Sequence, residues 1–303
     1  MDQRDECLKE RTVAIVGGDL RTLYAARLLA LEGCSCRLYG LGESRNPCDG
    51  GFEKGRCKAP YLMKEVLSDA DLLLLPVPLS RDGKTVNAPL SSMNLPLSIL
   101  NQGVLSALPV FGGGLELLPK GEGGERIDLL RDPLFAKENA LPTAEAALGL
   151  ALLEHPGVLF ESNCAILGYG NIASALLPLL RAAGARCTVF ARREEARLKA
   201  RAAGAQALCM KELCHRLSSF DILFNTVPAE LIDEEHAPLL KRDALYIELA
   251  SAPFGMCEKS RSLLKARHLF APALPGRYAP LYGGRLIAQR VSDYLKTHPS
   301  LHG

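Results

Sequence analysis

Short apolar runs alternate with segments of helical apolar spacing along the first part of the chain. Residues 12–18 form an apolar run that ends in two glycines, and residues 20–31 continue with apolar positions at helical spacing. Apolar runs at 36–39 and 70–77 have the character of further strands, the second buried and ended by proline. A glycine-rich segment at 119–128 is expected to be a surface loop. The pattern predicts an N-terminal α/β domain.

A helix is expected to lead from this domain into a second one. Pro142 and Thr143 open it, because Thr143 can cap the helix. Glu145 suits the positive end of the helix dipole, and the apolar spacing continues to about Glu154. The His-Pro-Gly sequence at 155–157 stops the helix.

Strand-like and helix-like segments alternate again after this helix, up to a turn at 271–276. Residues 280–297 are expected to form a final helix that returns to the first domain. Such alternation is typical of a parallel sheet with helices on both faces. The predicted fold is therefore α/β, with two Rossmann-like doubly wound domains and an interdomain cleft. The domains are expected at 1–141, joined by 277–303, and at 142–276.

Size and composition agree with two globular domains and exclude several classes of partner. The chain has 303 residues, more than the roughly 100 to 200 of a typical domain. The net charge is only +2, which favours neither nucleic acid nor an anionic membrane. The first residues carry charges where a signal peptide would be apolar, and no run approaches the ~20 apolar residues of a membrane helix. We therefore expect a cytoplasmic protein.

The ten cysteines are expected to be free thiols, since the cytoplasm is reducing. None has the paired C-x2-C or matched histidine spacing of a zinc site, so no metal is expected. Some lie in or beside apolar runs, where a thiol packs as a small hydrophobe. These are Cys34, Cys36, Cys164 and Cys187.

A strand followed by G-Y-G-N-I-A marks a candidate dinucleotide site in the second domain. Gly168 permits the tight turn, Gly170 lets the backbone approach a pyrophosphate, and Ala173 lets helix and strand pack closely. The helix that follows offers free N–H groups and a partial positive charge to the phosphates. The predicted cofactor residues here are Gly168, Tyr169, Gly170, Asn171, Ile172 and Ala173.

Arg192 and Arg193 follow the second strand of this unit, where the ribose specificity of such folds is decided. NAD enzymes usually carry Asp or Glu there, whereas guanidinium groups suit a 2′-phosphate, so NADP is favoured over NAD. The alternative is that the arginines open a charged surface helix with Glu194 and Glu195.

Two later strand ends are expected to line the same crevice, because ligands lie beyond the carboxyl ends of parallel strands. They carry Asn225, Thr226, Val227 and Pro228, and then Ala250 and Ser251. The first glycine pair, Gly17 and Gly18, lacks the full spacing and precedes Asp19, which would repel a phosphate. No second nucleotide is expected there, and Asp19 is either a helix cap or a residue of the cleft.

Together these motifs resemble the A subunit of the dipicolinate synthase family of spore-forming bacteria, over nearly the whole chain. The more particular motifs are GGDLR at 17–21, PTAEAALGLAL at 142–152, ELAS at 248–251 and APALPG at 271–276. The resemblance implies oxidation of dihydrodipicolinate, made from the cyclised aldol product of the lysine pathway, to pyridine-2,6-dicarboxylate during sporulation. It also implies NADP as acceptor and, as partner, a flavoprotein-like B subunit. Whether copies of the chain associate with one another is left open.

The substrate implied by the resemblance is a small dicarboxylate, which needs cationic or N–H anchors. Candidates lie at strand ends, at a helix start or on the 271–276 turn, and no histidine near a cofactor strand end serves as a base. They are Arg21, Arg81, Thr143, Ser251, Arg277 and Tyr278.

Two other functions stay open. The helix expected from Pro142 also resembles that of 2-hydroxy acid dehydrogenases, although no Arg, Glu and His catalytic set is evident. A non-catalytic cofactor-binding protein that supports the flavoprotein partner would also explain the absence of a clear acid or base.

Overall fold

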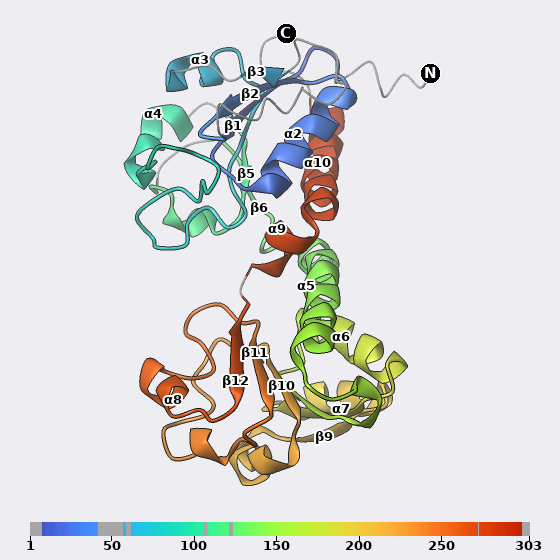
Figure 1. The fold of residues 1–303 in the computed structure, drawn as a ribbon. Helices are drawn as coiled ribbons and strands as arrows, with labels where there is room; N and C mark the ends of the chain where they lie inside the picture. The colour runs from blue at the N-terminus through green and yellow to red at the C-terminus, as the bar shows by residue number, and fades with distance from the viewer. Residues whose placement is uncertain are drawn as a thin grey trace. The chain divides into compact units, whose positions relative to one another are not determined.

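The structure is a computed structural model that describes residues 8–41, 57–58, 62–105, 108–120, 124–271 and 273–298. The chain divides into two compact units (Figure 1). Unit 1 comprises Met1–Glu138 and Ala279–Gly303, and unit 2 comprises Asn139–Tyr278. The division falls inside one continuous helix, α5 (Pro133–Glu154).

Unit 1 contains a six-stranded parallel sheet in the order β3-β2-β1-β4-β5-β6. The order in which the chain adds strands reverses between β1 and β4. In doubly wound folds, ligands bind at this point of the sheet. The strands are β1 (Thr12–Val16), β2 (Ser35–Tyr39), β3 (Cys57–Lys58), β4 (Leu72–Leu74), β5 (Val110–Gly112) and β6 (Arg126–Asp128).

Helices α2 (Leu20–Leu31) and α10 (Pro280–Thr297) pack together on one face of this sheet, with Val13 and Ile15 of β1 in the same core. Two glycines of α10 make the packing close, since a Cβ at Gly284 would lie 2.6 Å from Tyr24 Cβ. The opposite face is covered by a second core. Further helices are α3 (Met63–Leu67), α4 (Gln102–Leu105), η1 (Leu97–Ile99) and η2 (Leu115–Leu117).

A buried ion pair connects the sheet of unit 1 to its last helix. Arg11 Nη1 lies 2.9 Å from Asp71 Oδ1, and both side chains are about 95% buried. The second oxygen of Asp71 accepts a bond from Thr12 N at 2.9 Å. Arg11 also donates to the carbonyls of Leu295 and His298 at the end of α10. The pair therefore joins β1, the start of β4 and the C-terminal helix.

Unit 2 repeats the same topology, with a six-stranded parallel sheet in the order β12-β11-β10-β7-β8-β9. Alternate residues of β7 face opposite cores, with Ile166 towards α5, α6 and α7 and Ala165 towards the short helices of the other face. The strands are β7 (Asn163–Leu167), β8 (Arg186–Ala191), β9 (Gln206–Cys209), β10 (Ile222–Asn225), β11 (Leu245–Glu248) and β12 (Arg267–Phe270). The helices are α6 (Asn171–Ala182), α7 (Glu194–Ala202), α8 (Glu258–Ser262), α9 (Leu274–Tyr278), η3 (Leu159–Glu161), η4 (Met210–Glu212), η5 (Cys214–Ser219) and η6 (Ala237–Leu239).

The predicted α/β fold with two Rossmann-like domains is confirmed, and the last helix returns to unit 1 as expected. Two local predictions were wrong. The helix expected to open at Pro142 begins at Pro133, so Thr143 lies inside α5 and does not cap it. Pro142 has no backbone N–H to donate to the preceding turn. That turn is helical nonetheless, so the helix runs through Pro142. The expected loop 119–128 ends in β6, which pairs with β5 at the sheet edge.

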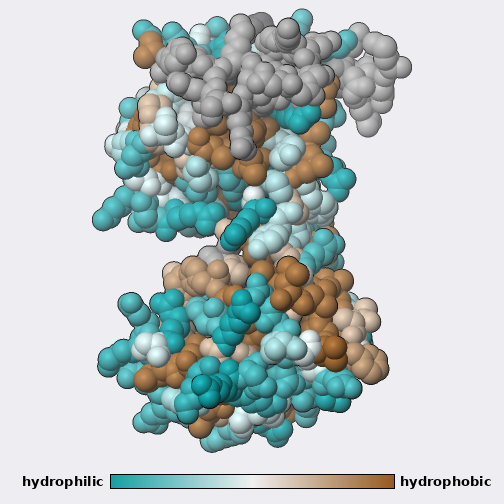
Figure 2. Space-filling view, in the orientation of Figure 1, coloured by the Kyte–Doolittle hydropathy of each residue, from teal (hydrophilic) through white to brown (hydrophobic). Residues whose placement is uncertain are grey.

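The surface of unit 2 carries apolar side chains around the C-terminal end of α5 and the following turn. Leu152, Leu153, Val158 and Phe160 are 61 to 81% exposed. Figure 2 shows hydrophobic surface over the part of unit 2 formed by α5 and α6. No helix among the described residues is long and apolar enough to cross a membrane.

Candidate cofactor site

The turn between β7 and α6 requires its first glycine. Gly168 has φ +90°, and a Cβ there would lie 2.6 Å from Val227 Cγ2 and 2.8 Å from Thr226 Oγ1. Its N–H donates to Phe190 O at 2.8 Å. Gly168 therefore allows the turn to pack against the carboxyl end of β10, which is the role expected for the first fingerprint glycine.

Gly170 has different surroundings. It is exposed, its φ is −103°, and a Cβ built on it would have no atom within 4 Å. It is the N-cap of α6 and supplies no side-chain cap, so the first N–H groups of the helix remain for a ligand. Ala173 is fully buried in the core between α6 and the sheet. Tyr169 and Ile172 are half-buried and Asn171 is exposed.

Arg192 and Arg193 are exposed at the end of β8. Within the described residues, no hydrogen bond or ion pair joins either guanidinium to another side chain. The two glutamates that follow are paired elsewhere, because Glu194 binds Arg197 and Arg201 and Glu195 binds Lys199. The acidic residues of α7 therefore pair within their own helix, and the two arginines at the strand end stay available for an anion.

Asn225, at the end of β10, is a buried member of the predicted cofactor motif. It is fully buried, its Nδ2 donates to Glu248 Oε1 at 2.7 Å and to Val227 O at 3.0 Å, and its Oδ1 accepts from Val227 N. Its amide forms hydrogen bonds within the fold and so supports this strand end, and its contact with the cofactor stays a prediction. Thr226 and Val227 are half-buried, and Pro228 is exposed at the same strand end.

Glu248, at the end of β11, was not identified from the sequence. It is 1% exposed, and Oε1 accepts from Asn225 Nδ2 and from Ala250 N at 3.1 Å. Oε2 accepts from Tyr246 Oη at 3.1 Å and from Gly255 N at 2.9 Å. Burial raises the pKa of Glu248, and the hydrogen bonds oppose that shift. The sequence does carry a sign of its role. Glu248 is the one charged residue in the apolar run LYIELA, and a charge buried in such a run needs a partner.

This glutamate fixes the loop that carries Ala250 and Ser251. Ala250 is 3% exposed, so it contributes backbone rather than side chain to any surface, whereas Ser251 is exposed. Arg277 is exposed on α9, with its guanidinium carbon 5.6 Å from the centre of the Tyr278 ring. Ser251 and Arg277 therefore remain accessible to an anion.

Two further predicted anchors, Thr143 and Arg21, are largely buried. Thr143 is 6% exposed, and its Oγ1 lies 3.5 Å from Asn139 O one turn earlier in α5. Arg21 is 5% exposed and forms an ion pair with Asp19 at 2.8 Å. Asp19 is the N-cap of α2 and accepts from Arg21 N. Their shared role as substrate anchors stays a prediction, since the two residues belong to different units.

The glycine pair of unit 1 is covered by the chain itself. Gly17 and Gly18 have positive φ angles, but a Cβ at Gly17 would lie 2.6 Å from Val86 Cγ1 and 3.5 Å from Ala88 Cβ. Gly18 N donates to Asn87 O at 2.9 Å. Gly17 thus packs as tightly as Gly168 does, and the difference between the two turns lies at the helix N-cap. That position is Gly170 in unit 2, without a side-chain cap, and Asp19 in unit 1, whose carboxylate accepts from Arg21 N.

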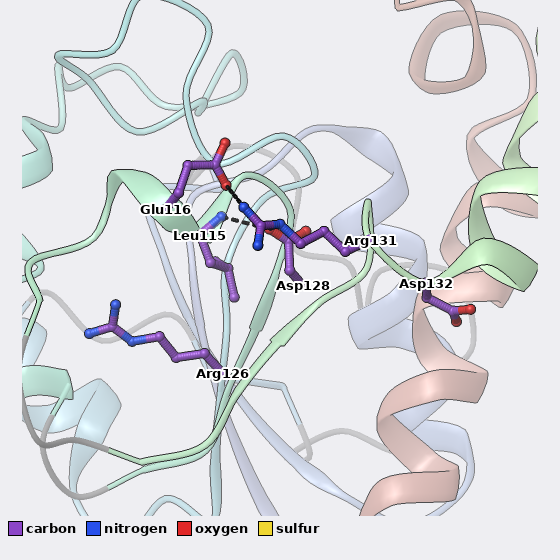
Figure 3. A pocket seen from close by; sticks show the side chains of 6 residues that line it. All are labelled: Leu115, Glu116, Arg126, Asp128, Arg131 and Asp132. Carbon is purple, nitrogen blue, oxygen red and sulfur yellow. Dashed lines mark hydrogen bonds and ion pairs between the residues drawn. The ribbon is translucent and has the colours of Figure 1, made fainter.

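Unit 1 also contains a pocket of about 430 Å³ near the ends of β5 and β6 (Figure 3). Asp128 fixes its wall by accepting from Gly114 N and Leu115 N. Three carboxylates and two guanidinium groups line it, which disfavours a dianionic ligand. Its lining residues are Leu115, Glu116, Arg126, Asp128, Arg131 and Asp132.

The thiols expected to pack as hydrophobes, Cys34, Cys36, Cys164 and Cys187, are buried. Burial raises the pKa of Cys187 to about 11, so this thiol is not a nucleophile at neutral pH. Among the described residues, no group of three His, Cys, Asp or Glu side chains is placed to hold a metal ion.

Comparisons with known proteins find relatives over nearly the whole chain. Residues 12–117 match the family model for the N-terminal domain of the dipicolinate synthase A subunit. The chain is 25% identical over 291 residues to the A subunit of dipicolinate synthase from Bacillus subtilis (strain 168), covering 93% of this chain and 95% of that protein. These matches confirm the resemblance predicted from the sequence.

Solved structures confirm the fold. The A subunit of dipicolinate synthase from Bacillus halodurans has a TM-score of 0.79 at 21% identity, over 95% of this chain and 98% of that chain. A transhydrogenase from Sinorhizobium meliloti has a TM-score of 0.63 at 16% identity, over 93% of each chain. The two parallel-sheet α/β domains are therefore a fold that this chain shares with both of these proteins.

Proposed function

We propose that this chain, which resembles the A subunit of dipicolinate synthase over nearly its whole length, is an NADP-dependent oxidoreductase of that type. Its substrate is dihydrodipicolinate and its product pyridine-2,6-dicarboxylate, made in the cytoplasm during sporulation. Its partner is a flavoprotein-like B subunit. The observation that carries the proposal is the open turn at Gly170 together with two exposed arginines at the end of β8.

The residues of unit 2 fit a dinucleotide phosphate. The N–H groups at the start of α6 and the space at Gly170 accept a pyrophosphate, because an extended N-cap without a side-chain cap leaves those donors unbonded. Arg192 and Arg193 suit a 2′-phosphate, for which paired guanidinium groups provide charge and several donors. NADP, when bound, supplies the acceptor for a hydride.

The reaction demands little acid or base chemistry from the protein. The substrate ring would lose a hydride from one carbon, for which bound NADP would be the acceptor, and a proton from the neighbouring carbon to solvent. The ring becomes aromatic, so the stability of the product favours the step and catalysis is mainly positioning. Glu248 contributes by holding the backbone of Ala250 and Gly255, and hence the loop that carries Ser251.

The decisive experiment uses the purified full chain, with and without its B subunit, and freshly generated dihydrodipicolinate with NADP under anaerobic conditions. Pyridine absorbance and NADPH are followed separately, and a sample without protein measures spontaneous oxidation. The proposal expects both signals to rise together with the chain present. Pyridine without NADPH, and only with the B subunit, would instead identify a supporting role for this chain. NADPH formed from 2-hydroxy acids but not from dihydrodipicolinate would identify the other dehydrogenase class.

Replacing Arg192 and Arg193 together by Ala is expected to weaken NADP selectively. A lost hydrogen bond to a charged group costs about 1.5 to 3 kcal/mol, or roughly ten- to hundredfold in Kd. The affinity for NAD should hardly change, because NAD lacks the 2′-phosphate. Calorimetric titration of both cofactors measures the difference.

Arg242→Ala is the control for this pair. Arg242 is exposed ahead of β11, at the amino ends of the parallel strands, so its loss removes a positive charge far from the strand end that carries Arg192. It should leave both affinities unchanged. Equal losses of NAD and NADP affinity in the double arginine variant would mean that the arginines do not recognise the 2′-phosphate.

A further inference from the structure

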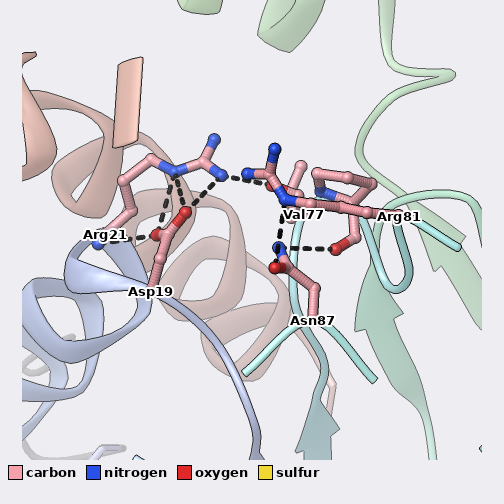
Figure 4. Close-up of polar contacts among 6 residues, drawn as sticks. Asp19, Arg21, Val77, Arg81 and Asn87 are labelled. Carbon is pink, nitrogen blue, oxygen red and sulfur yellow. Dashed lines mark hydrogen bonds and ion pairs between the residues drawn. The ribbon is translucent and has the colours of Figure 1, made fainter. Parts of the chain in front are cut away.

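Two arginines lie together at the carboxyl ends of β1 and β4 in unit 1, the point where the strand order of that sheet reverses. Arg21 is in the first turn of α2, directly after β1, and Arg81 follows β4. Figure 4 shows their guanidinium groups side by side, with outer nitrogens that point the same way. Val77 O accepts from Arg21 Nη2, and the next residue, Pro78, accepts from the side chain that holds Arg81.

Arg21 is held rigidly from one side. Its Nε lies 3.1 Å and its Nη2 2.8 Å from oxygens of Asp19, and its side chain is 94% buried. Nη1 takes part in none of these bonds, and Figure 4 shows it directed away from Asp19. A charged group that is this deeply buried, with one edge still open, is a preorganised donor for an anion.

Arg81 is held in a similar way by a buried amide. Its Nε donates to Asn87 Oδ1 at 3.1 Å, and Asn87 is 7% exposed. Asn87 is itself fixed, because its Nδ2 donates to Pro78 O at 3.3 Å and its backbone bonds Leu79 O and Gly18 N. Within the described residues, neither terminal nitrogen of Arg81 has a hydrogen-bond partner.

The charges of this cluster leave an excess of one positive charge, since Asp19 offsets only one of the two guanidinium groups. Adjacent like charges repel each other, and a bound anion offsets that cost. A planar carboxylate matches the two guanidinium edges better than it matches the pocket of Figure 3, which three carboxylates line.

We propose that Arg81, with the outer nitrogen of Arg21, binds one carboxylate of the dicarboxylate substrate, and that Asp19 and Asn87 are positioning residues for the two guanidinium groups. The identity of the ligand as a pyridine or dihydropyridine dicarboxylate rests on the proposed function. The anion site itself rests on the geometry of unit 1.

The test is direct binding of pyridine-2,6-dicarboxylate to the full chain, measured by calorimetry without cofactor. Arg81→Gln is expected to weaken this binding about ten- to hundredfold, since it removes charged hydrogen bonds. Arg81→Lys should recover only part of the loss, because an ammonium keeps the charge but not the paired donors. Lys84→Gln removes the same charge from an exposed side chain of the same loop, and it should bind as the wild type.

Two further measurements separate a local role from a general one. Asn87→Ala leaves the charge of Arg81 in place but removes its support, so it should weaken dicarboxylate binding while NADP affinity stays unchanged. Pyridine-2-carboxylate, with one carboxylate fewer, should bind more weakly to the wild type than the dicarboxylate, and Arg81→Gln should reduce this difference.

The outcomes distinguish this site from the proposed function. If the wild type does not oxidise dihydrodipicolinate but Arg81→Gln still weakens dicarboxylate binding, the anion site is supported and the proposed reaction is wrong. If both the wild type and Arg81→Gln oxidise dihydrodipicolinate, with the same KM for this substrate, the proposed reaction is supported and the anion site is wrong. Equal dicarboxylate affinities of wild type and Arg81→Gln, or no binding by either, would also overturn the site.

Discussion

Gly170→Val is expected to abolish NADP binding while the protein remains folded. A Cβ at this position meets no atom within 4 Å, so the substitution creates no collision inside the chain. The same open space is where the pyrophosphate must approach the backbone. Losing two hydrogen bonds to a charged group costs about 3 to 6 kcal/mol, which is more than about a hundredfold in Kd. Calorimetric titration with NADP measures the loss, and circular dichroism with thermal unfolding checks the fold.

Gly149→Val is the matched control for this variant. Gly149 lies in α5, outside the fingerprint, and a Cβ added to it would likewise meet no atom of a neighbouring element within 4 Å. It should leave NADP affinity unchanged. Unchanged affinity in Gly170→Val itself would remove residues 168 to 173 from the cofactor site.

Asp71→Ala is expected to lower the free energy of unfolding by about 3 to 5 kcal/mol, because breaking a buried pair leaves an uncompensated charge inside the protein. Arg11 would keep its bonds to the carbonyls of α10 but lose the carboxylate that balances its charge. Thr12 N would lose its acceptor as well. Equilibrium unfolding of the full chain in urea measures the loss.

Replacing both Arg11 and Asp71 tests whether the unpaired charge of Arg11 causes the loss of stability. Arg11→Met combined with Asp71→Ala should be more stable than Asp71→Ala alone, since neither charge of the pair then remains buried. Asp243→Ala, at an exposed carboxylate of unit 2, should have little effect. A single Asp71→Ala variant as stable as the wild type would show that the ion pair contributes nothing to the fold.

Much of the candidate site could be predicted from local rules. Gly168 has the positive φ that a tight turn requires, and Gly170 has the open space that a pyrophosphate requires. Both requirements depend on a few residues that are neighbours in the sequence, so the G-x-G-x-x-A motif is enough to predict them. The strands β1 and β7 and the helices α2 and α10 follow equally from the spacing of apolar residues.

The start of α5 and the edge strands could not be predicted in this way. Strands β3, β6 and β9 have two to four residues, too few for a pattern, and each exists because a neighbouring strand offers bonds to it. Pro142 and Thr143 have the residue types of a helix start, yet the preceding turn is also helical. Residue preferences are weak beside such tertiary contacts.

The sequence by itself determined the two βαβ beginnings, the glycine fingerprint and the presence of two arginines after β8. Only the tertiary structure decided which polar groups are available. It pairs Asn225 with Glu248 across neighbouring strands, keeps Glu194 and Glu195 within α7, and places Val86 over Gly17. These outcomes depend on residues that are distant along the chain, because a polar group is free for a ligand only if no other part of the fold already binds it.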